Sequence, residues 1–142
     1  VERSRGLGDV YKRQAYQYAE TGLPLCPVFT AGRGEITTAL YQKKRGQWCQ
    51  LTAEHITTVE ALCSQITTRT LFCGEYVVPI APQLKKLLGQ KAVISSSLTG
   101  LRRASFLAEL GLSQFKAGNY DNPATLQPLY LRRPSITQAR HR

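Results

Sequence analysis

Residues 25–51 read LCPVFTAGRGEITTALYQKKRGQWCQL, three apolar or β-branched segments separated by two glycine-containing turns. Each segment has the length of a strand, and turn residues bound it on both sides. The predicted strands are Leu25–Thr30, Ile36–Tyr41 and Trp48–Leu51, with turns at Ala31–Gly34 and Lys43–Gly46. Because strands joined by such short turns pair antiparallel, we expect a three-stranded meander.

After the meander, helical and strand patterns alternate. Thr57 and Glu60 have the Thr-x-x-Glu spacing of a capping box that opens a helix. Apolar residues then follow at the spacing of one helix face: Val59, Leu62, Cys63 and Ile66. The further elements expected are a strand over Thr70–Cys73, a helix over Pro82–Leu88 with Leu84, Leu87 and Leu88 inward, a strand over Ala92–Ser95 and a helix over Thr99–Leu112.

The order of these elements predicts the fold class. Strands that alternate with helices pair in parallel, and right-handed crossovers place both parallel strands beside the first strand of the meander. We therefore expect a single α/β lobe with strand order 3-2-1-4-5 and covering helices. This arrangement is that of the ribonuclease H-like fold, the lobe that occurs twice in actin-like ATPases.

The composition is that of one compact domain. The chain has 142 residues, of which 42% are hydrophobic and 20% charged, close to the globular average. No apolar run approaches the ~18 residues of a membrane span, and no secretory signal pattern follows the early charges. The expected location is the cytoplasm, without membrane contact.

The chain contains no methionine, so we expect it to be a fragment. Residues 1–14 end in DVYKRQ, which resembles a translated sequencing adaptor, and this segment is expected to be non-native. Residues 15–22 are expected to end a helix from a missing first lobe, and residues 23–117 to form the ribonuclease H-like second lobe. Residues 118–142 are expected to be a linker and a C-terminal basic tail.

The formal net charge is +10, and most of the excess lies near the two ends. The C-terminal arginines are Arg132, Arg133, Arg140 and Arg142, and no acidic residue lies among them. A solvated tail and an RNA-binding tail both fit this pattern. No aromatic residues alternate with the arginines to favour RNA.

The side chains offer little catalytic chemistry. A two-metal nuclease needs clustered carboxylates, and only Glu35 and Glu75 lie near predicted strand ends. Ser95–Ser97 has no nucleophile-elbow pattern, and Ser97 is expected to cap a helix. Neither His55, expected just before a helix, nor His141 has a partner that would orient a catalytic base. We therefore expect no catalytic residue, cofactor or metal site.

The four cysteines are Cys26, Cys49, Cys63 and Cys73. They form no Cys-x-x-Cys pair and have no neighbouring histidine, which argues against zinc. We expect reduced and mostly buried thiols.

The turn around Gly32 and Gly34 lies where actin-like ATPase lobes hold phosphate on backbone amides. Two glycines are also what a tight hairpin needs for positive φ angles. The Asp that active relatives carry in this loop is missing, because Thr30 or Ala31 takes its place. Any phosphate site here is expected to be inactive.

Two strings resemble the TsaB family, also called YeaZ. CPVFTAGRGEI at Cys26–Ile36 is similar to the D-A-R-x-G-E-V segment that opens the second lobe of that family, and LYLRRP at Leu129–Pro134 is similar to its C-terminal P-x-Y-L-R ending. The matching residues are Arg33, Gly34 and Glu35 in the loop and Tyr130, Leu131 and Arg132 in the ending. The chain departs from the family at Thr30, where Asp is usual, and at Ile36-Thr37, where Val-Tyr is usual.

The resemblance implies a non-catalytic subunit of the machinery that makes threonylcarbamoyladenosine in transfer RNA. Members of the family dimerise with the TsaD transferase and organise it with a small ATPase subunit, chiefly through the first lobe. A homodimer of the complete protein is a further expectation. The loop and terminal motifs are expected to be structural, with Arg132 and Arg133 available for contact with tRNA phosphate.

Two other functions remain open from the sequence. The chain could be the second half of a paralogous transferase or sugar kinase, whose ligands would lie largely in the other half. It could also be a free-standing RNA-binding module that depends on its basic ends.

Overall fold

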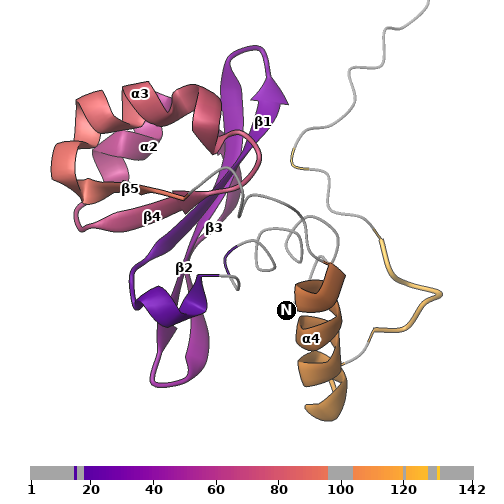
Figure 1. Ribbon diagram of the computed structural model, residues 1–142. Coiled ribbons are helices and arrows are strands. Elements are labelled where there is room, and N and C mark those ends of the chain that lie inside the picture. The colour runs from indigo at the N-terminus through magenta and orange to yellow at the C-terminus, as the bar shows by residue number, and fades with distance from the viewer. Residues whose placement is uncertain (1–14, 16–17, 96–103, 120, 128–130, 132–142) are drawn as a thin grey trace, which may run out of the picture.

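The computed structural model describes residues 15, 18–95, 104–119, 121–127 and 131 (Figure 1). The strands are β1 (Leu25–Gly32), β2 (Glu35–Lys44), β3 (Gln47–Thr57), β4 (Thr70–Cys73) and β5 (Ala92–Ile94). The helices are η1 (Ala19–Thr21), α2 (Val59–Gln65), α3 (Val77–Leu88), η2 (Gly89–Lys91) and α4 (Ala104–Lys116). Of these helices, none has the length and apolar character that crossing a membrane requires.

The five strands form one sheet in the order β3-β2-β1-β4-β5, which confirms the predicted order. β2 pairs antiparallel with both β1 and β3. β4 lies parallel to β1, with Leu71 opposite Leu25, and β5 lies parallel to β4. The single α/β lobe expected from the sequence is therefore present, with the antiparallel meander on one side of β1 and the parallel pair on the other.

Apolar layers form on both faces of the sheet, because alternate residues of a strand point to opposite faces. Cys26, Val28 and Phe72 belong to the layer beneath α2 and α3, which lie side by side on one side of the sheet (Figure 1). The opposite layer consists of Ala15, Leu25, Ala39, Tyr41, Leu71 and Cys73. The cysteines at positions 26 and 73 thus lie in different layers.

The hairpin of β2 and β3 is longer than predicted. Its turn consists of Arg45 and Gly46 alone, with φ angles of 49° and 78°. Two adjacent residues with positive φ are typical of the type I′ turn, which matches the twist of a hairpin. Pairing with β2 then carries β3 beyond the predicted end at Leu51, as far as Thr57. His55, expected just before a helix, lies within β3, and α2 begins four residues later at Val59.

Helix α2 begins one residue later than the capping box predicts. The N-cap is Thr58 rather than Thr57, and its Oγ1 accepts a hydrogen bond from the Ala61 N–H at 3.3 Å. Glu60 instead accepts a hydrogen bond from the Gln83 side chain of α3 at 2.5 Å. The predicted inner face is confirmed by the buried residues Val59, Leu62, Cys63 and Ile66.

Helix α3 begins at Val77, ahead of the predicted start at Pro82. Prolines usually end helices, but Pro79 lies in the first turn, where its missing N–H has no partner within the helix. The earlier start changes the inner face, which consists of Val77, Ile80 and Leu84. Leu87 is 48% exposed, so its predicted inward position was wrong. Leu88 packs at the margin of the core.

The remaining elements agree with the sequence in part. β4 has its predicted bounds, and β5 ends at Ile94, one residue early. Gly22 is a left-handed C-cap with φ 69° at the end of the 3-10 turn η1. α4 runs to Lys116, beyond the predicted Leu112. The predicted helix start at Thr99 lies outside the described residues, as does Ser97.

Candidate functional site

The motif loop, which contains the matching residues Arg33, Gly34 and Glu35, forms the turn between β1 and β2. Gly32, Arg33 and Gly34 have positive φ angles of 77°, 55° and 77°. Arg33 and Gly34 are exposed, while Glu35 is half-buried and pairs with Gly32 at the start of β2. A Cβ at Gly34 would meet no heavy atom within 4 Å, so the space beside this turn is open. Arg33 is therefore exposed to solvent, and the two glycines provide the positive φ angles that this turn requires.

A close backbone contact lies after the parallel strand β4. Gly74 has φ 108°, and a Cβ there would lie 2.5 Å from the Val28 carbonyl oxygen of β1. The same carbonyl accepts a hydrogen bond from the Tyr76 N–H, just before α3, at 3.3 Å. Gly74 thus lets α3 approach the central strand, and Glu75, the next residue, is exposed.

Ser95 follows β5, and its N–H donates a hydrogen bond to the Phe72 carbonyl at 2.9 Å. Its Oγ is buried and has no hydrogen-bond partner in the part of the chain that the structure describes. Ser96 and Ser97, the other members of this predicted serine cluster, lie outside that part.

The thiols are free, as predicted, and three of the four are buried. Burial raises the pKa of Cys26 to about 12, although the Thr38 hydroxyl 3.1 Å from its Sγ lowers it in part. Burial also raises the pKa of Cys63, and it raises the pKa of Cys73 well above the ordinary value. Thiols held in the neutral form are poor nucleophiles, so burial disfavours nucleophilic chemistry at these three positions.

A hydrogen-bonded group on β2 and β3 was not predicted. The Tyr41 hydroxyl donates to Glu54 Oε1 at 2.5 Å, and the Gln50 amide donates to Glu54 Oε2 at 3.0 Å. Tyr41 is fully buried in the layer opposite α2 and α3. The group satisfies a buried phenol and links the two strands. The strand register pairs Tyr41 with Gln50 and not with Glu54, so the length of β3 alone would not have predicted this contact.

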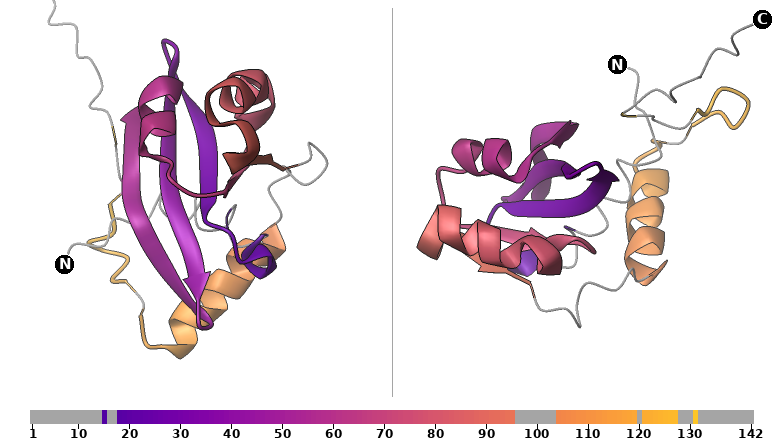
Figure 2. Two further views of the ribbon diagram at one scale, coloured as in Figure 1. Left: turned by 90° about the vertical axis from the view of Figure 1, so that its left-hand side faces the viewer. Right: turned by 90° about the horizontal axis from the view of Figure 1, so that it is seen from above.

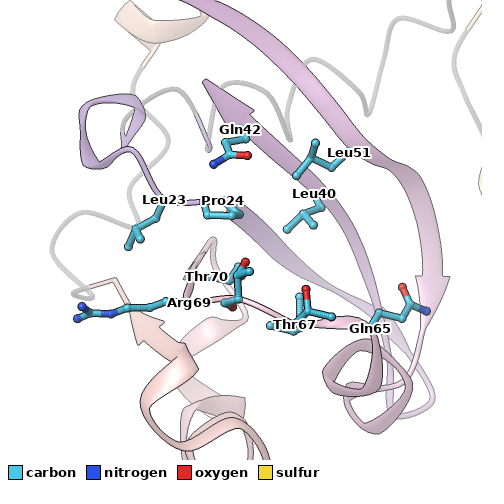
Figure 3. Close-up of a pocket in the computed structure, with 11 residues that line it drawn as sticks. Leu23, Pro24, Leu40, Gln42, Leu51, Gln65, Thr67, Arg69 and Thr70 are labelled. Atoms are coloured by element: carbon cyan, nitrogen blue, oxygen red, sulfur yellow. The ribbon is translucent and has the colours of Figure 1, made fainter. Parts of the chain in front are cut away.

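A hollow of about 520 Å³ opens at the end of the sheet opposite the turn at Arg33, before β1 and β4 begin (Figure 3). Its lining residues are Leu23, Pro24, Leu40, Gln42, Leu51, Gln65, Ile66, Thr67, Thr68, Arg69 and Thr70. They come from segments distant in sequence, and the sequence pattern contained no signal for this site.

Metal ligands do not cluster among residues 15, 18–95, 104–119, 121–127 and 131. The Nδ1 of His55 lies 2.8 Å from the Ala53 carbonyl oxygen, a local contact within β3. In the terminal motif, Leu131 is half-buried, and Tyr130, Arg132 and Arg133 lie outside the described residues. His141 also lies outside them.

Comparison with known proteins gives similarity at the level of structure. No family model matches the chain, and no curated protein does. An uncharacterized protein with similarity to peptidase YeaZ from Pseudomonas aeruginosa superposes with a TM-score of 0.63 at 18% identity, over 87% of this chain and 56% of that one. YeaZ from Pseudomonas aeruginosa gives 0.60 at 17% identity, over 86% and 56%.

These matches establish the fold. The five-stranded sheet and its helices are those of YeaZ proteins, as the resemblance in the sequence implied. The chain spans about half the length of the solved structures that it matches. This chain therefore shares its fold with the YeaZ structures that it matches.

Proposed function

We propose that this chain is a lobe of a TsaB-like, non-catalytic subunit that organises a TsaD-type transferase in the modification of tRNA to threonylcarbamoyladenosine. The observation that carries the proposal is the agreement of two independent signals over the same residues. The loop string at Cys26–Ile36 resembles the TsaB family, and the sheet that contains it superposes on YeaZ proteins over 87% of the chain.

The side chains favour an organising role over a hydrolytic one. One structural neighbour is described as similar to a peptidase, and a cysteine peptidase would need an activated thiolate. The buried thiols of Cys26 and Cys73 have raised pKa values, the opposite of what activation requires. Arg33, in the motif loop, is an exposed turn residue with open space beside it.

A chimera tests the proposal, because the family assembles chiefly through the first lobe. Residues 23–142 of this chain would replace the second lobe of Pseudomonas aeruginosa YeaZ. We expect the chimera, mixed with the other subunits of that bacterium and tRNA, to support more threonylcarbamoyladenosine formation than YeaZ without its second lobe, because the transplanted residues have the same fold. Nucleoside mass spectrometry measures the product.

Native YeaZ and YeaZ without its second lobe are the two controls. A chimera that unfolds cooperatively but supports no more product than the truncated control would contradict the proposal. Thermal unfolding of the chimera separates that result from simple misfolding.

A second experiment addresses the proposed contact of Arg132 and Arg133 with tRNA phosphate. Each phosphate contact releases condensed counterions, so the Arg132→Ala/Arg133→Ala variant is expected to bind tRNA more weakly and to lower the slope of log affinity against log salt by about 2. Lys85→Ala/Lys86→Ala on α3 is the control with the same charge change and should leave affinity nearly unchanged. Equal binding by the arginine variant and the wild type would exclude the contact.

A further inference from the structure

The turn between β2 and β3 concentrates positive charge at one end of the sheet. Lys43, Lys44 and Arg45 are consecutive, and no other three neighbouring positions among the described residues are all basic. Lys44 and Arg45 are exposed. In the left view of Figure 2, this turn lies at the lower end of the sheet, whereas α2 and α3 lie beside the upper part. The basic turn is therefore open to a partner.

The backbone of Arg45 is unusual for an arginine. Its φ angle is 49°, in the left-handed region that residues with a Cβ rarely adopt. Type I′ turns favour asparagine, aspartate or glycine at this position, because these residues tolerate a positive φ. Among the described residues other than glycine, Arg33 alone shares this property. Turn geometry does not explain an arginine here, and a strained residue of this kind points to a role for its side chain.

The carboxylates near this end of the sheet are already occupied. Glu20 pairs with Lys43, with 2.9 Å between its Oε1 and the lysine Nζ. Both carboxylate oxygens of Glu54 accept hydrogen bonds from side chains of β2 and β3. In the part of the chain that the structure describes, neither Lys44 nor Arg45 forms an ion pair or a side-chain hydrogen bond. These two cations are therefore available to an external anion.

A phosphate chain complements this arrangement. The Cα atoms of Lys44 and Arg45 lie ~3.8 Å apart, well within the Debye length of ~8 Å at physiological salt, so their fields add. A guanidinium also binds phosphate oxygens through two parallel N–H donors. The rings of this hairpin offer little for base stacking, because Tyr41 is buried and Trp48 is half-buried. The charges, rather than the rings, determine the ligand.

We infer that the β2–β3 turn contacts the phosphate backbone of RNA through Lys44 and Arg45, while Glu20 holds Lys43 back. The choice of RNA among polyanions rests on the proposed function, whereas the basic turn itself rests on the structure. The position differs from that of Arg33, which lies at the other end of β2, ~33 Å away along a ten-residue strand.

Binding of the full chain to tRNA, followed by fluorescence anisotropy over a salt series, tests the inference. Lys44→Gln/Arg45→Asn is expected to bind ~10-fold more weakly at low salt and to lower the slope of log affinity against log salt by about 2. Because asparagine suits the left-handed turn, the urea midpoint of this variant should equal or exceed that of the wild type. Lys85→Gln/Lys86→Gln on α3 removes the same charge and should leave affinity nearly unchanged.

Glu20→Gln provides a test in the opposite direction. This substitution removes the partner of Lys43 and a negative charge beside the turn, so tRNA is expected to bind ~2-fold more tightly and with a steeper salt dependence. Weaker binding by this variant would contradict the inference.

Several outcomes would overturn the contact with RNA. These are no tRNA binding by the wild type, equal binding by the turn variant, and an equal loss in the α3 control, which would show an effect of net charge alone. Competition by polyglutamate as effective as that by unlabelled tRNA would indicate an acidic protein partner instead. Unchanged binding by the turn variant leaves the chimera experiment unaffected, whereas a folded chimera without product fails the proposed function whatever the turn binds.

Discussion

Replacing Gly74 by alanine is expected to lower the free energy of unfolding by about 3 kcal/mol or more. The added Cβ would lie 2.5 Å from the Val28 carbonyl oxygen and 3.0 Å from the Val28 nitrogen, and φ at this position is 108°. Neither atom can move freely, because β1 is the central strand and the same carbonyl accepts the Tyr76 N–H. Urea unfolding followed by circular dichroism measures the loss, and a variant that no longer unfolds cooperatively agrees with it.

Gly34→Ala is the matched control for this prediction. Gly34 also has a positive φ, 77°, but a Cβ there would meet nothing within 4 Å. Its replacement should therefore cost only the backbone strain of ~1–2 kcal/mol. If Gly74→Ala were no more destabilised than Gly34→Ala, the close approach of the Gly74 backbone to β1 would be wrong.

The strand order could be predicted because it depends on patterns that are local in the sequence. The two glycine-containing turns fix the meander, and the alternation after Thr57 fixes two parallel crossovers whose handedness is nearly invariant. The same patterns identified the buried face of α2, where Val59, Leu62 and Cys63 recur at helical spacing. The inner face of α2 follows from periodicity, which requires no knowledge of neighbouring elements, whereas that of α3 was predicted wrongly at Leu87 because the helix begins earlier than expected.

Element ends were predicted less well because they depend on tertiary contacts. Pro79 and Pro82 led to a predicted helix start that was too late, because prolines usually end helices. The packing of Val77 and Ile80 on the core keeps this turn helical. Pairing with β2 determines the length of β3, and no apolar pattern marks it after Leu51. Thr57 and Thr58 are both acceptable N-caps, and the backbone path out of β3 selects the second.

Among the candidate sites, too, only the one formed by neighbouring residues of the sequence could be predicted. The turn at Arg33 and Gly34 is contiguous in the sequence, so glycine spacing alone located it. The hollow near Arg69 draws on segments before β1, on β2 and β3, and after α2, and only the folded sheet brings them together. The pairing of Tyr41 with Glu54 likewise requires the register of two strands.

The thiols allow a test that bears directly on a hydrolytic role. At pH 8 a thiol with a pKa of about 12 is ionised to roughly one part in ten thousand. We therefore expect iodoacetamide to label Cys26 at least ~1000-fold more slowly than the half-exposed Cys49, with Cys73 similarly protected, because alkylation requires an accessible thiolate. Peptide mass spectrometry over a time course gives each rate.

Labelling in concentrated guanidinium chloride is the control, since all four cysteines should then react at similar rates. Between pH 8 and 10 an ordinary thiol becomes mostly ionised, whereas Cys26 keeps its proton until about pH 12 and its sulfur stays buried. The labelling rate of Cys26 should therefore rise by a much smaller absolute amount than that of a free thiol. Native-state labelling of Cys26 or Cys73 within tenfold of Cys49 would show an accessible thiolate in the core. That result would revive a nucleophilic role for Cys26 or Cys73, whereas protection of both argues against one.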